Sequence, residues 1–321
     1  MKPINSIMSL LLGLVIFTSC ADGEKNTADD ISDTEEVTID EPNYYENGVL
    51  TVVTEAMDFQ TADTLKSGWN KIVYKNLSPE VHFVLLDLYP EGKSVENAKE
   101  DIAPPFDEGM AYLNEGNVDS AMVAFGKLPE WFPEIKFVGG TGLISPQHTA
   151  ESMVNLKPGT YVMECYVKMA DGTFHLSHGM VKGLTVLEES TNLQPPAADY
   201  TISISTAGLN MEGSPSSGKK TFRVNYQDQK TYEHFLGHDV NLVRYENSVK
   251  TDSLIPWLNW MNPTGLKTPP PAGFTFLGGV NNMLAGDTGY FEVDLTPGNY
   301  LLISEVPDAK KKGLYKEFKV E

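Results

Sequence analysis

An internal repeat is the feature of this sequence that most restricts how the chain can fold. Phe137 to Gly140 (FVGG) recurs as Phe276 to Gly279 (FLGG), and Asn155 to Val162 (NLKPGTYV) recurs as Asp294 to Leu301 (DLTPGNYL). Both matches fall at the same offset along the chain, with no gap between them. Self-similarity of this kind indicates that one structural unit occurs twice.

Outside one segment, the sequence texture predicts an all-β fold. Runs such as Leu50 to Thr54 (LTVVT) and Lys71 to Lys75 (KIVYK) alternate apolar and polar residues and are separated by Gly, Pro and Asn. Pro158-Gly159 predicts a turn into a strand, with Tyr161 near the strand entrance as in the tyrosine corner of other sandwiches. Only Ser94 to Phe125 is typical of helix, with two short helices around a Glu-Gly-Asn turn. We therefore predict two tandem Greek-key β-sandwiches with a helical insertion in the first.

The N-terminus predicts export. Lys2 and the apolar run Met8 to Phe17 form a signal-peptide pattern that is too short to span a bilayer. The residues Phe17 to Cys20 (FTSC) resemble the lipobox of bacterial lipoproteins. That resemblance implies that Cys20 is acylated and anchors the protein at the periplasmic or cell-surface side of a bacterial membrane. The alternative is an ordinary cleaved signal peptide with an incidental cysteine.

The repeat and the composition together divide the 321 residues into four predicted segments. A linker from Glu188 to Ala197, stiffened by Pro195-Pro196, separates the two copies. The segments are a signal peptide (1–20), an acidic disordered tether (21–44), a first sandwich domain (45–190) and a second, degenerate domain (198–321).

Charge and cysteine content limit the partners. The net charge of -20 should repel nucleic acid and anionic lipid headgroups, which makes both poor partners, and it favours cations, basic proteins or neutral small molecules. Cys165 is the only thiol besides Cys20, so once Cys20 is acylated Cys165 has no intramolecular disulfide partner. A lone thiol in an oxidising compartment is either buried and inert or bound to something.

The first domain contains a set of soft metal ligands in a familiar order. The matching residues are Asn76 and His82, then Pro158 to Cys165 (PGTYVMEC), then His175, and Gly179-Met180 before a last strand. In this order they resemble the cupredoxin (blue-copper-like) family across nearly the whole domain. The resemblance implies that His82, Cys165, His175 and Met180 hold one copper ion. A thiolate, two imidazoles and a weak axial thioether are the ligands that copper takes in electron-transfer sites.

The spacing within this set leaves two histidines open. Nine residues separate Cys165 from His175, and they include Asp171-Gly172, a strong hairpin signal. A two-residue turn there pairs Cys165 with His178 instead. His175 and His178 lie on opposite faces of an extended segment, because side chains alternate. Family spacing favours His175, and hairpin arithmetic favours His178.

The second domain is an internal control. Ser304 replaces Cys165, Leu314 replaces Met180, and the loop histidine is missing, so no copper site is expected there. His238 nevertheless stands at the position of His82. His82 is therefore either a ligand or a hydrogen-bonded structural residue common to both copies.

These features predict a lipid-anchored, extracytoplasmic copper-binding protein that carries electrons or handles copper. Its partners would be a redox or copper-exchange protein and, through the anchor, a membrane. No enzyme is expected, because the sequence has no Walker-type loop, Gly-x-Ser-x-Gly, His-Glu-x-x-His or Cys-x-x-Cys motif. The alternative is a metal-free surface interaction or scaffold lipoprotein with the same folds.

Overall fold

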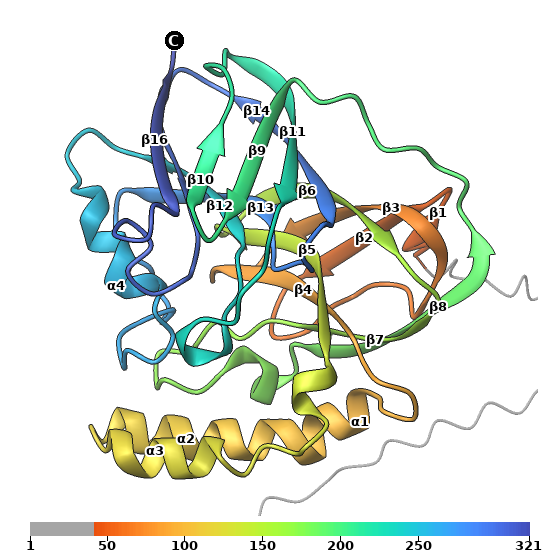
Figure 1. The fold of residues 1–321 in the computed structure, drawn as a ribbon, viewed down its shortest axis with the longest axis vertical. Coiled ribbons are helices and arrows are strands. Elements are labelled where there is room, and N and C mark those ends of the chain that lie inside the picture. The colour runs from red at the N-terminus through yellow and green to blue at the C-terminus, as the bar shows by residue number, and fades with distance from the viewer. Residues whose placement is uncertain (1–41) are drawn as a thin grey trace, which may run out of the picture. The chain divides into compact units, whose positions relative to one another are not determined.

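The computed structural model describes residues 42–321, which form one compact unit (Figure 1). The predicted signal peptide, the acylated Cys20 and nearly all of the predicted tether lie outside these residues. Strands make up most of the regular structure, so the predicted all-β fold is confirmed. No helix between residues 42 and 321 is both long and apolar enough to cross a membrane.

Sixteen strands occur among the described residues. They are β1 (Tyr45–Glu46), β2 (Val49–Thr54), β3 (Thr64–Asn76), β4 (His82–Leu88), β5 (Lys136–Ile144), β6 (His148–Leu156), β7 (Gly159–Glu164), β8 (Val181–Ser190), β9 (Tyr200–Ser205), β10 (Gly208–Met211), β11 (Gly218–Tyr226), β12 (Val240–Tyr245), β13 (Phe274–Val280), β14 (Thr288–Leu295), β15 (Gly298–Ile303) and β16 (Tyr315–Val320).

Helices are fewer and shorter. The α-helices are α1 (Val95–Asn97), α2 (Ala103–Asn114), α3 (Val118–Phe125) and α4 (Leu254–Leu258), and a π-helical turn, η1 (Ala98–Ile102), joins α1 to α2. The described residues also contain four 3-10 turns, which are η2 (Phe132–Glu134), η3 (His175–His178), η4 (Glu233–Phe235) and η5 (Thr251–Ser253).

Two kinds of strand follow directly from the residue pattern. In β2 every second side chain is buried, as an alternating sequence requires of a strand with one solvated face. In β4 (HFVLLDL) the first six residues are all buried, because the strand lies between β5 and β7 inside the protein. A continuous apolar run is the signature of such a strand.

The strand pairing is similar in the two halves of the described chain. In the first half β4 lies between β5 and β7, with β8 next to β7; in the second, β12 lies between β13 and β15, with β16 next to β15. The halves also pair with each other, β5 with β13 and β6 with β14. The predicted domain limits, 45–190 and 198–321, stay a prediction, because residues 42–321 pack as one unit.

The repeated Gly-Gly pair has a steric cause. Gly140 has φ +127°, and a Cβ on it would clash with the carbonyl group of Val84 on β4. Gly279 has φ +136°, and its Cβ would clash with the carbonyl group of Val240 on β12. Both glycines therefore stand where the neighbouring strand approaches too closely for any side chain.

The repeated tyrosine has an equally local cause. The Tyr161 hydroxyl donates to the Lys157 carbonyl at 2.8 Å and accepts from the Lys157 amide at 3.1 Å. Tyr300 makes the same two bonds with Thr296, at 2.8 and 3.1 Å. Each buried ring thus closes the turn that precedes its own strand, as the predicted tyrosine corner requires.

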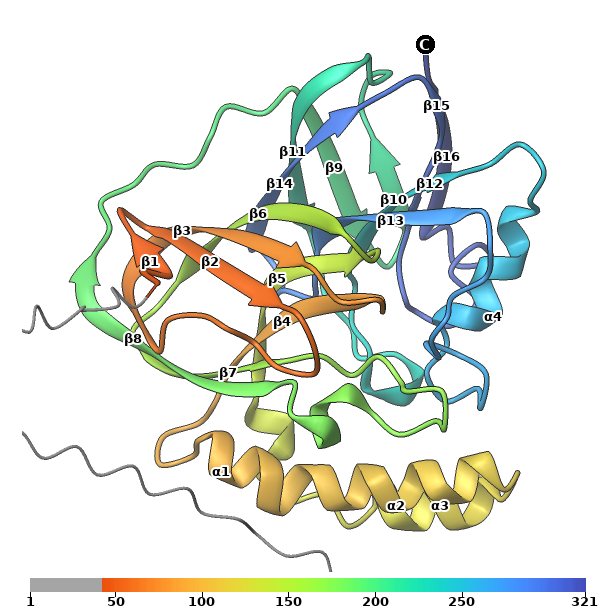
Figure 2. The same ribbon diagram turned by 180° about the vertical axis from the view of Figure 1, so that it is seen from behind.

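The helical insertion is confirmed. Asn117 ends the predicted Glu-Gly-Asn turn, and its side chain accepts a hydrogen bond from the Ser120 amide at the start of α3. Gly109 on α2 lies against the ring of Phe125 on α3, where a Cβ would clash, so the two helices pack closely. Figures 1 and 2 both show α1, α2 and α3 as a layer beneath the strands β4 and β7.

Candidate metal centre

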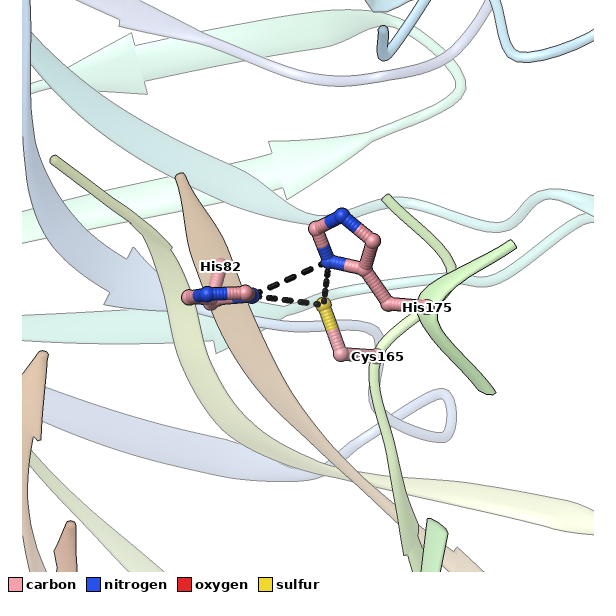
Figure 3. A group of neighbouring side chains, drawn as sticks. All are labelled: His82, Cys165 and His175. Atoms are coloured by element: carbon pink, nitrogen blue, oxygen red, sulfur yellow. Dashed lines mark hydrogen bonds between the residues drawn. The ribbon is translucent and has the colours of Figure 1, made fainter. Parts of the chain in front are cut away.

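Three side chains from three separate elements meet at one end of the first half. His82 is the first residue of β4, Cys165 directly follows β7, and His175 begins η3. The strands β4 and β7 pair antiparallel with Leu85 opposite Glu164, so the start of β4 lies beside the end of β7. Figure 3 shows the three side chains pointing toward one another.

The three potential ligand atoms form a compact triangle. Cys165 Sγ lies 3.9 Å from His82 Nδ1 and 3.8 Å from His175 Nδ1, and the two nitrogens are 3.0 Å apart. The point equidistant from all three atoms lies about 2.1 Å from each, which matches the roughly 2.0–2.3 Å of metal bonds to imidazole nitrogen and thiolate sulfur. The triangle therefore fits one metal ion, and two imidazoles with one thiolate are a donor set that suits copper.

Burial sets the protonation of these groups in the absence of metal. All three side chains have no exposed surface. Burial lowers the pKa of His82 to about 3. Burial also lowers the pKa of His175 to about 3, with smaller effects from His82 and His178. The same cause raises the pKa of the Cys165 thiol to about 12. At neutral pH both imidazoles are therefore neutral, and the thiol carries its proton.

Neighbouring polar groups orient both imidazoles. His82 Nε2 lies 2.8 Å from the hydroxyl of Ser78, and that hydroxyl also lies 2.8 Å from the side-chain oxygen of Asn76. His175 Nε2 lies 3.0 Å from Glu80 Oε2, although within residues 42–321 neither atom has an aligned hydrogen bond. In each ring Nε2 thus faces a polar partner and Nδ1 faces the cysteine. Partners of this kind fix the tautomer and direction of metal-binding histidines.

Met180 is connected to the triangle through its main chain. Its amide donates to the His175 carbonyl at 3.0 Å, and its carbonyl accepts from the Cys165 amide at 3.1 Å. The side chain is fully buried in the same apolar core as Cys165. Gly179, with φ +119°, makes the sharp return from η3 possible. The role of Met180 as axial ligand stays a prediction.

His178 lies outside the triangle. It is exposed, and its Nε2 lies 2.7 Å from the hydroxyl of Thr173. The predicted two-residue hairpin at Asp171-Gly172 is wrong in register, because Lys168 pairs with Phe174 and not with His175. A shift of one residue moves every following side chain to the opposite face. The chain then enters η3, which starts at His175 and turns that ring inward.

In the second half, the side chains at the corresponding positions make hydrogen bonds to other groups of the protein. The Ser304 amide donates to the Leu314 carbonyl at 3.1 Å, as the Cys165 amide does to Met180, but the Ser304 hydroxyl donates to Asp239 at 2.5 Å. His238 lies 2.8 Å from the Tyr232 hydroxyl and 3.2 Å from the Asp228 carbonyl oxygen. Within the described chain, His82, Cys165 and His175 alone form a close group of three His, Cys or carboxylate ligands.

Sequence reasoning missed two residues of the centre. Ser78 and Glu80 lie between Asn76 and His82, in the segment Asn-Leu-Ser-Pro-Glu-Val-His. Their spacing was a usable signal, since polar residues a few positions before a buried histidine can reach its ring from a tight turn. The turn itself is held by Asn76, whose side-chain amide donates to the Glu80 carbonyl at 2.7 Å.

Comparison with known proteins shows which solved structures this chain is similar to in fold. No family model and no curated protein matches the chain. The solved structure of auracyanin A, a blue copper protein from the green thermophilic photosynthetic bacterium Chloroflexus aurantiacus, is 19% identical; the match covers 43% of this chain and 98% of that chain, with a TM-score of 0.27. A multicopper oxidase is 13% identical over 85% of this chain and 88% of its own, with a TM-score of 0.22. The copper-containing nitrite reductase from Thermus scotoductus SA-01 is 12% identical over 85% of this chain and 61% of its own, with a TM-score of 0.22.

One prediction is corrected by these structures. The chain was expected not to be an enzyme, yet an oxidase and a reductase are among the similar folds, and each match covers 85% of the chain. The absence of short catalytic motifs is no ground for excluding an enzyme. In this protein the three candidate ligands come from residues 82, 165 and 175, so a centre of this kind leaves no contiguous motif to find.

Proposed function

We propose that the protein is an extracytoplasmic copper protein whose centre consists of His82, Cys165 and His175, with Met180 as a weak axial ligand. The observation that carries this proposal is the triangle of three buried donor atoms around a space the size of one metal ion. Copper bound by such donors supplies one-electron redox chemistry. We infer electron transfer as the main role.

Rigidity of the ligands supports electron transfer over delivery of copper. His82 is held by its hydrogen bond to Ser78, His175 Nε2 lies 3.0 Å from Glu80, and Cys165 is tied by its amide to Met180. A preformed set of donors on strand ends keeps its geometry when the charge at the centre changes. Complete burial of the three side chains also excludes water from the donors. Release of a metal from this site would instead require the segment around η3 to open.

Ligand protonation sets one requirement for binding. Only the thiolate binds metal strongly, and the Cys165 thiol has a pKa of about 12 in the metal-free protein. Metal entry therefore displaces one proton from Cys165, whereas the neutral imidazoles release none.

We also propose that the two halves are tandem copies of one domain and that the second has lost its centre. Three correspondences support this. They are the paired glycines Gly140 and Gly279, the paired turn tyrosines Tyr161 and Tyr300, and the paired amide bonds from Cys165 to Met180 and from Ser304 to Leu314.

The N-terminal sequence supports a location for the protein, and the location suggests a class of partner. Met8 to Phe17 and Cys20 support export and acylation, so the centre would work at the outer side of a bacterial membrane. A redox or copper-exchange protein at the same membrane is the expected partner.

The test is copper stoichiometry on the full chain with two matched variants. Cys165→Ala removes the thiol, and Ser304→Ala removes the corresponding side chain of the second half. We expect one copper per chain and a thiolate-to-copper absorption band in the unchanged protein and in Ser304→Ala, and neither in Cys165→Ala. Equal and negligible copper in all three proteins would instead favour the metal-free surface scaffold.

A further inference from the structure

A cavity lies between the helical insertion and the sheet, beside the metal centre. It has a volume of about 90 Å³ and is lined by residues of β4, β5, α2 and the segments around η2, η3 and η4. Helix α2 covers this side of β4 and β7 in Figures 1 and 2. For scale, a closed cavity of about 150 Å³ holds a benzene molecule. This space is smaller but is not fully closed, so it suits a ligand of no more than one small ring.

The walls of the cavity are aromatic. Eight aromatic residues line it, and five of them form one cluster: Phe106, Phe132, Phe174, Phe235 and Trp260. They pack edge to face, with Phe106 contacting the other four rings at centroid distances of 5.9 to 6.2 Å. Aromatic faces carry partial negative charge and attract cations.

Two carboxyl groups line the same cavity. Asp87 on β4 and Glu164 on β7 lie on one face of the sheet, because Leu85 stands opposite Glu164 and Asp87 is two residues further along β4. Asp87 is 2% exposed, and its Oδ1 has no hydrogen-bond partner within residues 42–321. No lysine or arginine lines the cavity.

A buried carboxyl group without a partner is costly, and its ordinary remedy is a hydrogen bond from a donor or a positive charge. Burial, and next the proximity of Glu164, raise the pKa of Asp87 well above its usual range, as expected where no cation compensates the charge. A ligand that brings a cation to this wall removes the penalty.

We propose that the cavity binds a small aromatic amine, whose ring packs among the phenylalanines and whose ammonium group donates to Asp87. An apolar pocket with a few polar groups at one end is the usual form of a small-molecule site. The ring of such a ligand also matches the edge-to-face aromatic wall. The net charge of -20 draws cations toward the protein.

The bound amine would lie beside the metal centre and not in it. Glu164 directly precedes Cys165, and Phe174 directly precedes His175, so the cavity and the centre share two chain segments. None of the three candidate ligands lines the cavity, so binding there needs no copper, and this separates the inference from the function proposed above.

The test uses benzylamine, with benzyl alcohol and benzoate as controls of the same ring and similar size. Calorimetric titration of the full chain, with and without copper, should show benzylamine binding at least about tenfold more tightly than benzyl alcohol, and benzoate not binding. Asp87→Asn should lose about tenfold or more in benzylamine affinity, whereas Glu91→Gln, which removes an exposed carboxylate that does not line the cavity, should keep it.

A second variant makes the result independent of how well Asp87→Asn folds. Ala103 lines the cavity on α2, and Ala103→Leu fills the space while both carboxyl groups stay in the chain, so it should abolish benzylamine binding. Three outcomes would overturn the proposal: equal affinity for benzylamine and benzyl alcohol, unchanged affinity in Ala103→Leu, or binding that appears only when copper is present.

Discussion

At the scale of single residues, some groups of the candidate centre could be predicted from the sequence and others could not. The resemblance to cupredoxins pointed to His82, Cys165 and His175, and their thiolate and imidazole groups are ligands that soft metals take. Alternation of side chains could not choose between His175 and His178, since the choice depends on a one-residue difference in a turn. Ser78 was missed because its role exists only once the turn after Asn76 has formed.

The Ser78 hydroxyl gives the first prediction at this scale. Ser78→Ala should lower copper affinity about 10- to 100-fold, as loss of a hydrogen bond behind a metal-binding histidine commonly does. The reason is that His82 Nε2 loses its hydrogen-bond partner at 2.8 Å, and the imidazole ring is then no longer fixed in direction. Competition with a chelator of known affinity measures the change.

A serine outside the centre serves as the control for that experiment. The Ser205 hydroxyl accepts a bond from the Ala207 amide in a turn of the second half. Ser205→Ala should leave copper affinity as it is. Equal losses in the two variants would show that Ser78 acts only through general stability.

At the scale of elements, strands and turns were largely predictable because their causes are local. Neighbouring residues determine the alternation in β2, the Pro-Gly turn before β7 and the Asn117 cap of α3. The turn between β7 and η3 could not be predicted in this way, because its length is set by contacts with distant segments. The Lys168 amide donates to the Leu266 carbonyl at 2.7 Å, nearly a hundred residues away along the chain.

The close approach of β4 and β5 gives a prediction at this scale. Gly140→Ala should lower the free energy of unfolding by more than about 2 kcal/mol, because the new Cβ meets the Val84 carbonyl and forces the strands apart. Gly116→Ala is the matched control. It also has a positive φ, +78°, but nothing lies within 4 Å of its Cβ, so the cost should be about 1 kcal/mol. Urea unfolding of both variants tests the difference, and equal costs would refute the steric account.

At the scale of the whole described chain, ion pairs connect strands of the two halves. Lys71 on β3 lies 2.7 Å from Glu151 on β6 and 3.1 Å from Glu292 on β14, and Lys219 on β11 lies 2.8 Å from Glu292. These four strands are neighbours in the order β3, β6, β14, β11. The repeat predicted that two similar units exist, but periodicity within each unit says nothing about how their sheets meet. The pairing of β6 with β14 was for that reason beyond sequence reasoning.

Lys168 gives a pH prediction at this scale. It is fully buried and its Nζ donates to the carbonyl groups of Trp260 and Asn262, at 2.9 and 2.8 Å. Burial, with a smaller effect of Lys267, lowers its pKa from 10.5 to about 7. Between these two values the unfolded chain binds one proton more than the folded chain, so this lysine makes stability increase as pH rises from about 7 toward 10.5.

Urea midpoints across that pH range measure the effect. Lys168→Met should flatten the rise, because methionine fills a similar volume without a titrating group. Lys250→Met, at an exposed position, should retain the slope of the unchanged protein. A slope that is the same in all three proteins would contradict the pKa assigned to Lys168.

The contacts of Lys168 also say what a half without ligands of its own contributes. The segment that brings His175 to the centre runs through Lys168, and Lys168 is bonded through its amide, carbonyl and ammonium group to residues 260–268 of the other half. Any free energy gained by filling the centre is therefore shared with the joint between the halves, since ligand binding stabilises whatever structure positions the ligands. The second half therefore supports the centre from outside: its residues 260–268 hold in place the segment that carries His175.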